Sequence, residues 1–195
     1  MIYFPYVRGR RFELIGLKKA IEMNMVGNNI IPIIEPIQLN TTLLRTLKEY
    51  EDRQHPVIVI RNPQVGNFFN DIRFNRNNEV FQLYIKFIES SRYIYNGIIL
   101  NKTNINIVNQ VLGEGKPVVT IFSGNRDDLV LYDLIARKHV QYLYHLGPDT
   151  RWFDRIVREH KVIFQDHFHV MGKNADYLKN EDEFFSCDHL DYEKL

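Results

Sequence analysis

The sequence has a single cysteine, Cys187, so no disulfide can form within the chain. Proteins without internal disulfides are typical of a reducing compartment, and we expect a cytoplasmic protein. No apolar run approaches the ~18 residues that a membrane-spanning helix needs. The N-terminus also lacks the basic segment and the cleavage site of a signal peptide. The sequence therefore indicates neither a membrane protein nor a secreted one.

Strong charge of either sign is also missing, because the formal net charge is +1. The overall charge therefore does not indicate binding to nucleic acid or membranes, and such binding would need a local basic patch. The motifs GxGxxG, GxxxxGK[ST] and GxSxG are absent. The sequence therefore does not support a dinucleotide site, a P-loop or the nucleophile elbow of an α/β-hydrolase.

Apolar residues make up 45% of the 195 residues, and charged residues make up 25%. This composition predicts one folded domain over residues 1–195 with a sizeable core. Short apolar runs, which do not alternate with polar residues, are typical of strands buried on both faces of a parallel sheet. The eight runs are Ile2–Val7, Ile30–Ile34, Val57–Ile60, Gly97–Leu100, Val118–Phe122, Gln141–Tyr144, Val162–Phe164 and Phe184–Phe185.

Helical patterns fill the gaps between these runs, for example Leu14, Leu17 and Ile21 on one face. Seven or eight strand–helix units in succession predict an α/β fold that is (β/α)-barrel-like, with parallel strands in sequential order. The chain ends soon after the eighth run, so the barrel would be incomplete at its C-terminus. We therefore expect residues 181–195 to contact another protein, either a second copy of the chain or a separate polypeptide.

Segments at both ends resemble the prokaryotic and phage "beta protein" family. They are Tyr3–Gly9 with Phe12–Leu14, Ile31–Pro36, Lys173–Tyr177, Glu183–Ser186 and Asp188–Leu190. Members are often encoded beside a nuclease-like protein, so the resemblance implies a role in defence against phage with such a partner. Typical members continue past the last of these segments. The family supplies no established catalytic residues.

In a (β/α)-barrel, chemistry gathers at the carboxyl ends of the strands. Glu35, His145 and Asp166 directly follow or end predicted strands, and they are the candidate catalytic residues. His167 and His169 point the same way on an extended chain and are candidate ligands of a divalent metal ion. The alternative is that these histidines only form hydrogen bonds at the end of the barrel.

Basic side chains at the same strand ends are candidates for binding phosphate or nucleic acid, since guanidinium groups match phosphate oxygens. They are Arg8, Arg10, Arg61, Lys102 and Arg126. For any one of them, pairing with a carboxylate or a helix end is the alternative. Arg61 follows a buried run directly, which favours a place at the end of the barrel.

The long connection over residues 63–78 interleaves aromatic and basic residues. Phe68, Phe69, Arg73 and Arg76 suit stacking on bases and contact with phosphates. They equally suit a protein partner, and the phenylalanines could instead form a local core.

Three functions thus stay open. The first is a defence-associated protein that works with a nuclease-like partner and recognises nucleic acid or a nucleotide phosphate. The second is a metal-dependent phosphoester hydrolase, and the third is a non-catalytic scaffold that binds proteins, with a homo-oligomer as one form.

Overall fold

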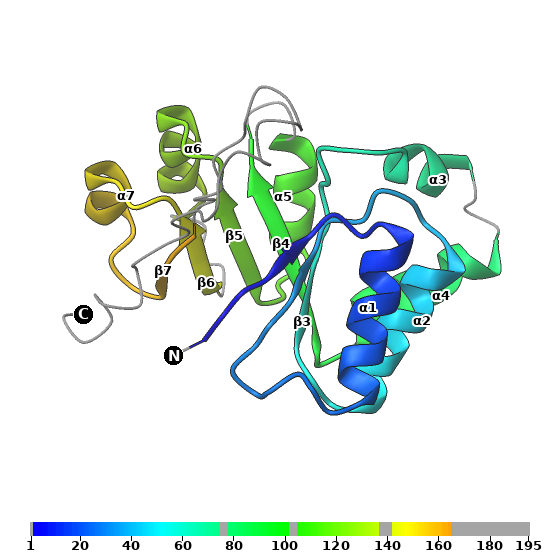
Figure 1. Ribbon diagram of the computed structural model, residues 1–195. Coiled ribbons are helices and arrows are strands. Elements are labelled where there is room, and N and C mark those ends of the chain that lie inside the picture. The colour runs from blue at the N-terminus through cyan, green and yellow to red at the C-terminus, as the bar shows by residue number, and fades with distance from the viewer. Residues whose placement is uncertain (1, 75–77, 102–104, 137–141, 165–195) are drawn as a thin grey trace, which may run out of the picture. The chain divides into compact units, whose positions relative to one another are not determined.

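The computed structural model describes residues 2–74, 78–101, 105–136 and 142–164 (Figure 1). Seven strands alternate with helices, and all strand pairs are parallel. The strand order is the sequence order, β1 to β7. The sheet curls through 221° and forms an open half-barrel. The predicted barrel-like α/β fold is thus confirmed, with seven described strands.

The strands are β1 (Tyr6–Val7), β2 (Ile33–Ile34), β3 (Val57–Ile60), β4 (Ile94–Leu100), β5 (Val118–Phe122), β6 (Tyr142–Gly147) and β7 (Lys161–Ile163). The helices are α1 (Arg11–Glu22), α2 (Thr41–Asp52), α3 (Phe68–Phe74), α4 (Glu79–Ser90), α5 (Ile105–Gly113), α6 (Arg126–Ala136) and α7 (Arg151–Ile156). Among the described helices, none is long and apolar enough to cross a membrane.

The first two strands are shorter than the apolar runs that predicted them. Pro5 and Pro32 lie within those runs and lack the N–H group that a continuous ladder needs. Backbone pairing nevertheless extends beyond the assigned strands, because Ile31 N donates to Tyr3 O (2.9 Å) and Ile33 N donates to Pro5 O (2.8 Å). The two segments therefore run side by side along their whole length.

The outer face of the sheet packs against the helices. One buried cluster joins Val57 and Val59 of β3 to α1, α2 and α4, and a second joins β4 and β5 to α5, α6 and α7. Figure 1 shows the same division, with α1, α2 and α4 grouped together and α6 beside α7. The helices thus cover one face of the half-barrel.

The inner face is apolar as well. Ile58 and Ile60 are buried but belong to neither outer cluster. A Cβ atom on Gly97 would lie 2.7 Å from Ile60 Cδ1, so glycine leaves the space that these isoleucines fill. Phe4 packs edge-on against Tyr144 of β6 with ring centroids 5.2 Å apart. Side chains from both halves of the sheet therefore meet inside its curve.

The connection after β3 contains a helix, α3, which the sequence analysis did not predict. Phe68 begins it and is buried, with its ring centroid 5.4 Å from that of Tyr84 in α4. Phe68 therefore belongs to the core, which is the alternative that the sequence left open for these phenylalanines. Its neighbours Phe69 and Phe74 are exposed.

Residues 1–163 form one compact unit. The eighth predicted strand and the predicted contact at residues 181–195 lie outside the described residues.

Candidate functional site

A buried carboxylate joins the ends of the first three strands. Glu35 follows β2 and is 4% exposed. Its Oε2 accepts a hydrogen bond from the Tyr6 hydroxyl of β1 (2.7 Å), and its Oε1 accepts one from the backbone N–H of Gln64 after β3 (2.6 Å). Both oxygens of Glu35 thus have a donor, as a buried charge requires.

Amide side chains continue this network to β4. Asn62 is fully buried and bonds to both backbone groups of Ile99: its Nδ2 donates to the carbonyl (2.6 Å), and its Oδ1 accepts from the N–H (2.9 Å). Gln64 Nε2 donates to the Asn62 carbonyl (2.6 Å), and Asn101 Nδ2 donates to Gln64 Oε1 (3.2 Å). The network therefore fixes the loops where these strands end. We call this edge of the sheet, marked by Val7, Ile34, Ile60, Leu100, Phe122 and Gly147, the carboxyl rim.

The phenol of Tyr6 stays a hydrogen-bond donor at all ordinary pH values. Burial, the hydrogen bond to Glu35 and the negative charge of Glu35 together raise the pKa of Tyr6 far above its usual value of 10. Arg8 lies close enough for its positive charge to act in the opposite direction. Arg8 thus stands near the Tyr6–Glu35 pair while its own side chain is exposed.

Three arginines cluster where β1 passes into α1. Arg8, Arg10 and Arg11 are exposed, and none makes an ion pair with the part of the chain that the structure describes. The nearby carboxylate of Glu13 is occupied, since its Oε2 accepts from Arg10 N (2.8 Å) at the start of α1. Phe12 follows them and is 82% exposed. We call these four residues the basic segment.

A second group of aromatic and basic side chains lies on α3. Arg73 and Phe74 are exposed, and the Arg73 guanidinium lies 5.9 Å from the centroid of the Phe74 ring. Two hydrogen bonds attach α3 to the loop after β2: Asn67 N donates to Ile37 O (2.8 Å), and Leu39 N donates to Asp71 Oδ2 (2.9 Å). These contacts hold α3 at the carboxyl rim.

Arg61 does not join this site. Its Nη1 donates to Asn96 Oδ1 (2.8 Å). Its Nη1 and Nη2 also each lie 3.2 Å from a carboxylate oxygen of Glu114, the residue that directly follows α5. Asn96 stands between Ile94 and Ile98, which both face the outer clusters. The prediction that Arg61 lines the rim is therefore wrong, because the strand alternation turns it towards the helices.

Replacing Arg61 with alanine is expected to destabilise the domain rather than to weaken ligand binding. The side chain is 13% exposed, and its loss leaves Asn96 and Glu114 without their donor. Losing such partly buried hydrogen bonds costs about 1–3 kcal/mol. Urea denaturation measures the change. Unaltered stability together with weakened anion binding would restore the rim role.

His145 also lies away from the rim residues. Its Nδ1 is 2.7 Å from Thr120 Oγ1, and its Nε2 is 3.2 Å from the hydroxyl of Tyr132 in α6. Burial, and secondly the charge of His160, lowers the pKa of His145 to about 4. The imidazole is thus a neutral group between the sheet and α6, and the structure does not bring it together with Glu35.

Most of the remaining predicted residues lie outside the part of the chain that the structure describes. Arg126 is the first residue of α6, after β5. Arg76, Lys102, Asp166, His167 and His169 lie outside the described residues. In the described part of the chain, no group of three or more His, Cys, Asp or Glu side chains could hold a metal ion. The divalent metal ion and its ligands stay a prediction.

Several residues of the site were not singled out from the sequence. Tyr6 and Gln64 were missed as the donors to Glu35, and Phe12 was missed as part of the exposed segment. The run Arg8–Phe12 did carry a signal, because three arginines and an aromatic residue follow directly on a predicted strand.

Comparisons with models of known protein families, with curated proteins and with solved structures find no match to this chain. The resemblance to the beta protein family therefore stays a prediction, and the function is argued from the geometry of the site.

Proposed function

We propose that this chain binds the phosphate groups of a nucleic acid or nucleotide at the carboxyl rim. The basic segment is the observation that carries the proposal. Arg8, Arg10 and Arg11 stand within four residues, are exposed, and have no carboxylate partner among the described residues. Guanidinium groups offer paired donors that match phosphate oxygens, so adjacent arginines favour a ligand with several phosphates.

The aromatic side chains near these arginines favour a nucleic acid over a simple anion. Phe12 is 82% exposed beside Arg11, and Phe74 is 77% exposed beside Arg73. Proteins that bind single strands combine a basic track with aromatic rings on which bases stack.

Glu35 has a positioning role in this proposal. With one donor on each oxygen, its carboxylate ties the ends of β1, β2 and β3 together. It thereby holds the chain just before the basic segment in place, so that this part of the chain loses little conformational entropy when a ligand binds.

The resemblance adds a biological setting to this proposal. If the beta protein family is the correct comparison, the chain acts with a nuclease-like partner in defence against phage. A complex recovered from cells that express the chain with its genomic neighbours would support that setting. Recovery of the chain alone would count against it.

The phosphate proposal predicts a loss of binding when the three arginines are removed. In the variant Arg8→Ala, Arg10→Ala, Arg11→Ala, affinity for a fluorescent single-stranded oligonucleotide should fall by about tenfold or more. Fluorescence anisotropy measures this change.

A matched control removes the same charge elsewhere. The control residues are Lys19 in the later part of α1, Lys86 in the later part of α4 and Arg92 just before β4. All three are exposed, and they make no ion pair with described residues. Replacing all three with alanine should leave affinity within about threefold of the wild type. Equal losses in both triple variants would show that only net charge matters, and the site would be disproved.

A further inference from the structure

A second feature of the carboxyl rim is a pocket of about 70 Å³ between the loops that follow β5 and β6. Its lining consists of Phe122, Gly124, Asn125, Pro148, Thr150, Trp152 and Phe153. Because all strands are parallel, the ends of β5 and β6 lie at the same edge of the sheet as the end of β1. The pocket and the basic segment therefore belong to the same rim.

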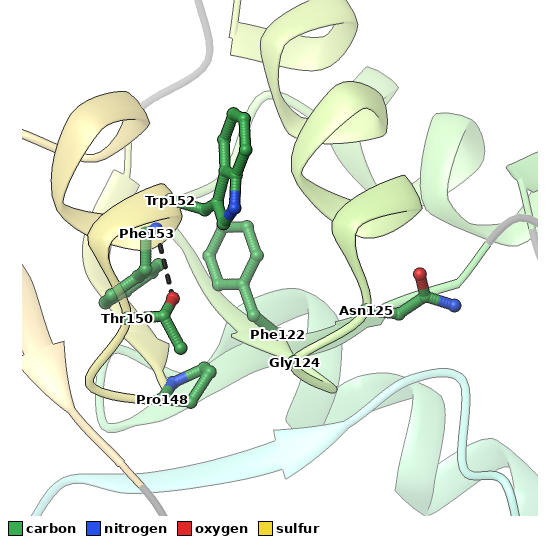
Figure 2. Close-up of a pocket in the computed structure, with 7 residues that line it drawn as sticks. All are labelled: Phe122, Gly124, Asn125, Pro148, Thr150, Trp152 and Phe153. Carbon is green, nitrogen blue, oxygen red and sulfur yellow. Dashed lines mark hydrogen bonds between the residues drawn. The ribbon is translucent and has the colours of Figure 1, made fainter.

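Three of the seven residues that line this pocket are aromatic. Phe122 and Phe153 are buried and pack edge-to-face, with ring centroids 5.0 Å apart. Figure 2 shows the indole of Trp152 above the Phe122 ring. Trp152 is 45% exposed, and the Arg155 guanidinium lies 6.0 Å from the centroid of its ring.

The polar side chains at the border of the pocket form hydrogen bonds to the backbone. Thr150 Oγ1 accepts from Phe153 N (3.2 Å) and begins α7. Asn125 Oδ1 accepts from Asp127 N (3.0 Å), and its amide points away from the pocket (Figure 2). The lining of the pocket is thus mainly apolar, and the Thr150 hydroxyl at its border is engaged with the backbone of α7.

The size and shape select the class of ligand. A closed apolar cavity of about 150 Å³ holds a whole benzene ring. An open pocket of about half that size takes one face or edge of a planar ring and leaves the rest in solvent. Flat aromatic walls suit stacking on a heteroaromatic ring better than they suit a branched aliphatic side chain.

We infer that this pocket binds a nucleobase, by stacking against Trp152 and Phe122. The inference deepens the proposed function and rests on it for the identity of the ligand: the phosphates contact the basic segment, and an unpaired base enters the pocket. It assigns single-stranded nucleic acid or a nucleotide, rather than a duplex, as the ligand class.

The tryptophan fluorescence of the protein reports on this pocket directly, because Trp152 is its only tryptophan. Adding adenosine, which has no phosphate, to the wild-type protein should quench the tryptophan fluorescence in a saturable manner. Ribose 5-phosphate, which has no base, should leave it unchanged. Saturable quenching by N-acetyltyrosinamide but not by adenosine would assign the pocket to a protein side chain and overturn the inference.

Two variants test the role of the ring. Trp152→Ala should weaken binding of a labelled single-stranded oligonucleotide by roughly tenfold, as expected for the loss of one stacked base. Trp152→Phe keeps an aromatic face and should stay within about threefold of the wild type. Val130→Ala removes another exposed apolar side chain, from α6, and should change nothing. Circular dichroism confirms that each variant is folded.

The outcomes separate this inference from the phosphate proposal. If adenosine does not quench Trp152 and Trp152→Ala binds the oligonucleotide normally, the base pocket is disproved, while the arginine variant still tests phosphate binding. If adenosine quenches Trp152 but the arginine variant binds the oligonucleotide as tightly as the wild type, the pocket stands and the basic segment is disproved.

Discussion

Replacing Gly66 with alanine is expected to destabilise the domain by about 3 kcal/mol or more, through backbone strain and overpacking together. Gly66 has a φ of +82°, a backbone conformation that is strained for a residue with a Cβ atom. An added Cβ would lie 2.3 Å from Ile37 O and 2.7 Å from Ile37 Cα. These are backbone atoms, so no rotation of a side chain relieves the clash. Chemical denaturation measures the loss.

A control at another glycine should give the opposite result. Gly16 lies in α1, and an added Cβ there meets nothing within 4 Å. Alanine in a helix interior is more stable than glycine by about 0.5–1 kcal/mol, so Gly16→Ala should raise stability. If Gly66→Ala is as stable as the wild type, the close packing between the loops after β2 and β3 is contradicted.

Acidification is expected to destabilise the domain through His145. The pKa of this histidine is lowered from 6.5 to about 4, chiefly by burial. Above pH 6.5 the imidazole is neutral in both the folded and the unfolded states. Between pH 6.5 and 4 only the unfolded state takes up the proton, so stability falls as the pH falls. At about 1.4 kcal/mol per pKa unit, the loss by pH 4 is about 3 kcal/mol.

The variant His145→Gln removes this titration and keeps a polar group beside Thr120 and Tyr132. Its free energy of unfolding should fall less steeply than that of the wild type over the same pH range. His160 is exposed and is the smaller cause of the shift, so His160→Gln should keep most of the acid sensitivity. Identical pH profiles for wild type and His145→Gln would contradict the buried position of His145.

The fold was predictable because two features of the sequence indicate the strands, namely the apolar runs themselves and the helical patterns between them. The run Val57–Ile60 is wholly apolar, Val118–Phe122 is apolar except for Thr120, and helical patterns separate such runs. Such strands occur in parallel sheets covered by helices, and repeated right-handed crossovers put them in sequential order. The structure has this order for all seven described strands.

The direction of the side chains at the strand ends was not predictable in the same way. Val57, Ile58, Val59 and Ile60 are all fully buried, so the sequence does not tell which of them face the helices. Arg61 follows an inward-facing isoleucine and turns outward, whereas Glu35 follows the outward-facing Ile34 and turns inward. A shift of one residue thus decides whether a charged group belongs to the rim or to the helix layer.

The helix α3 was missed for a different reason. It has only seven residues, which is too few for a helical period to stand out from the surrounding loop. Its buried face consists of Phe68 and the partly buried Ile72, and a local pattern cannot distinguish Phe68 from the exposed Phe69 and Phe74. Only the contact with Tyr84, which is 16 residues further along the chain, separates them.

The salt dependence of oligonucleotide binding tests the phosphate site most directly. Each phosphate contact to a single strand adds about 0.7 to the slope of log affinity against log salt concentration. Removing Arg8, Arg10 and Arg11 together should therefore reduce that slope by about 2 relative to the wild type. The control variant without Lys19, Lys86 and Arg92 should keep the wild-type slope. An unchanged slope in the arginine variant would show that the basic segment does not contact phosphate, and would contradict the proposed function.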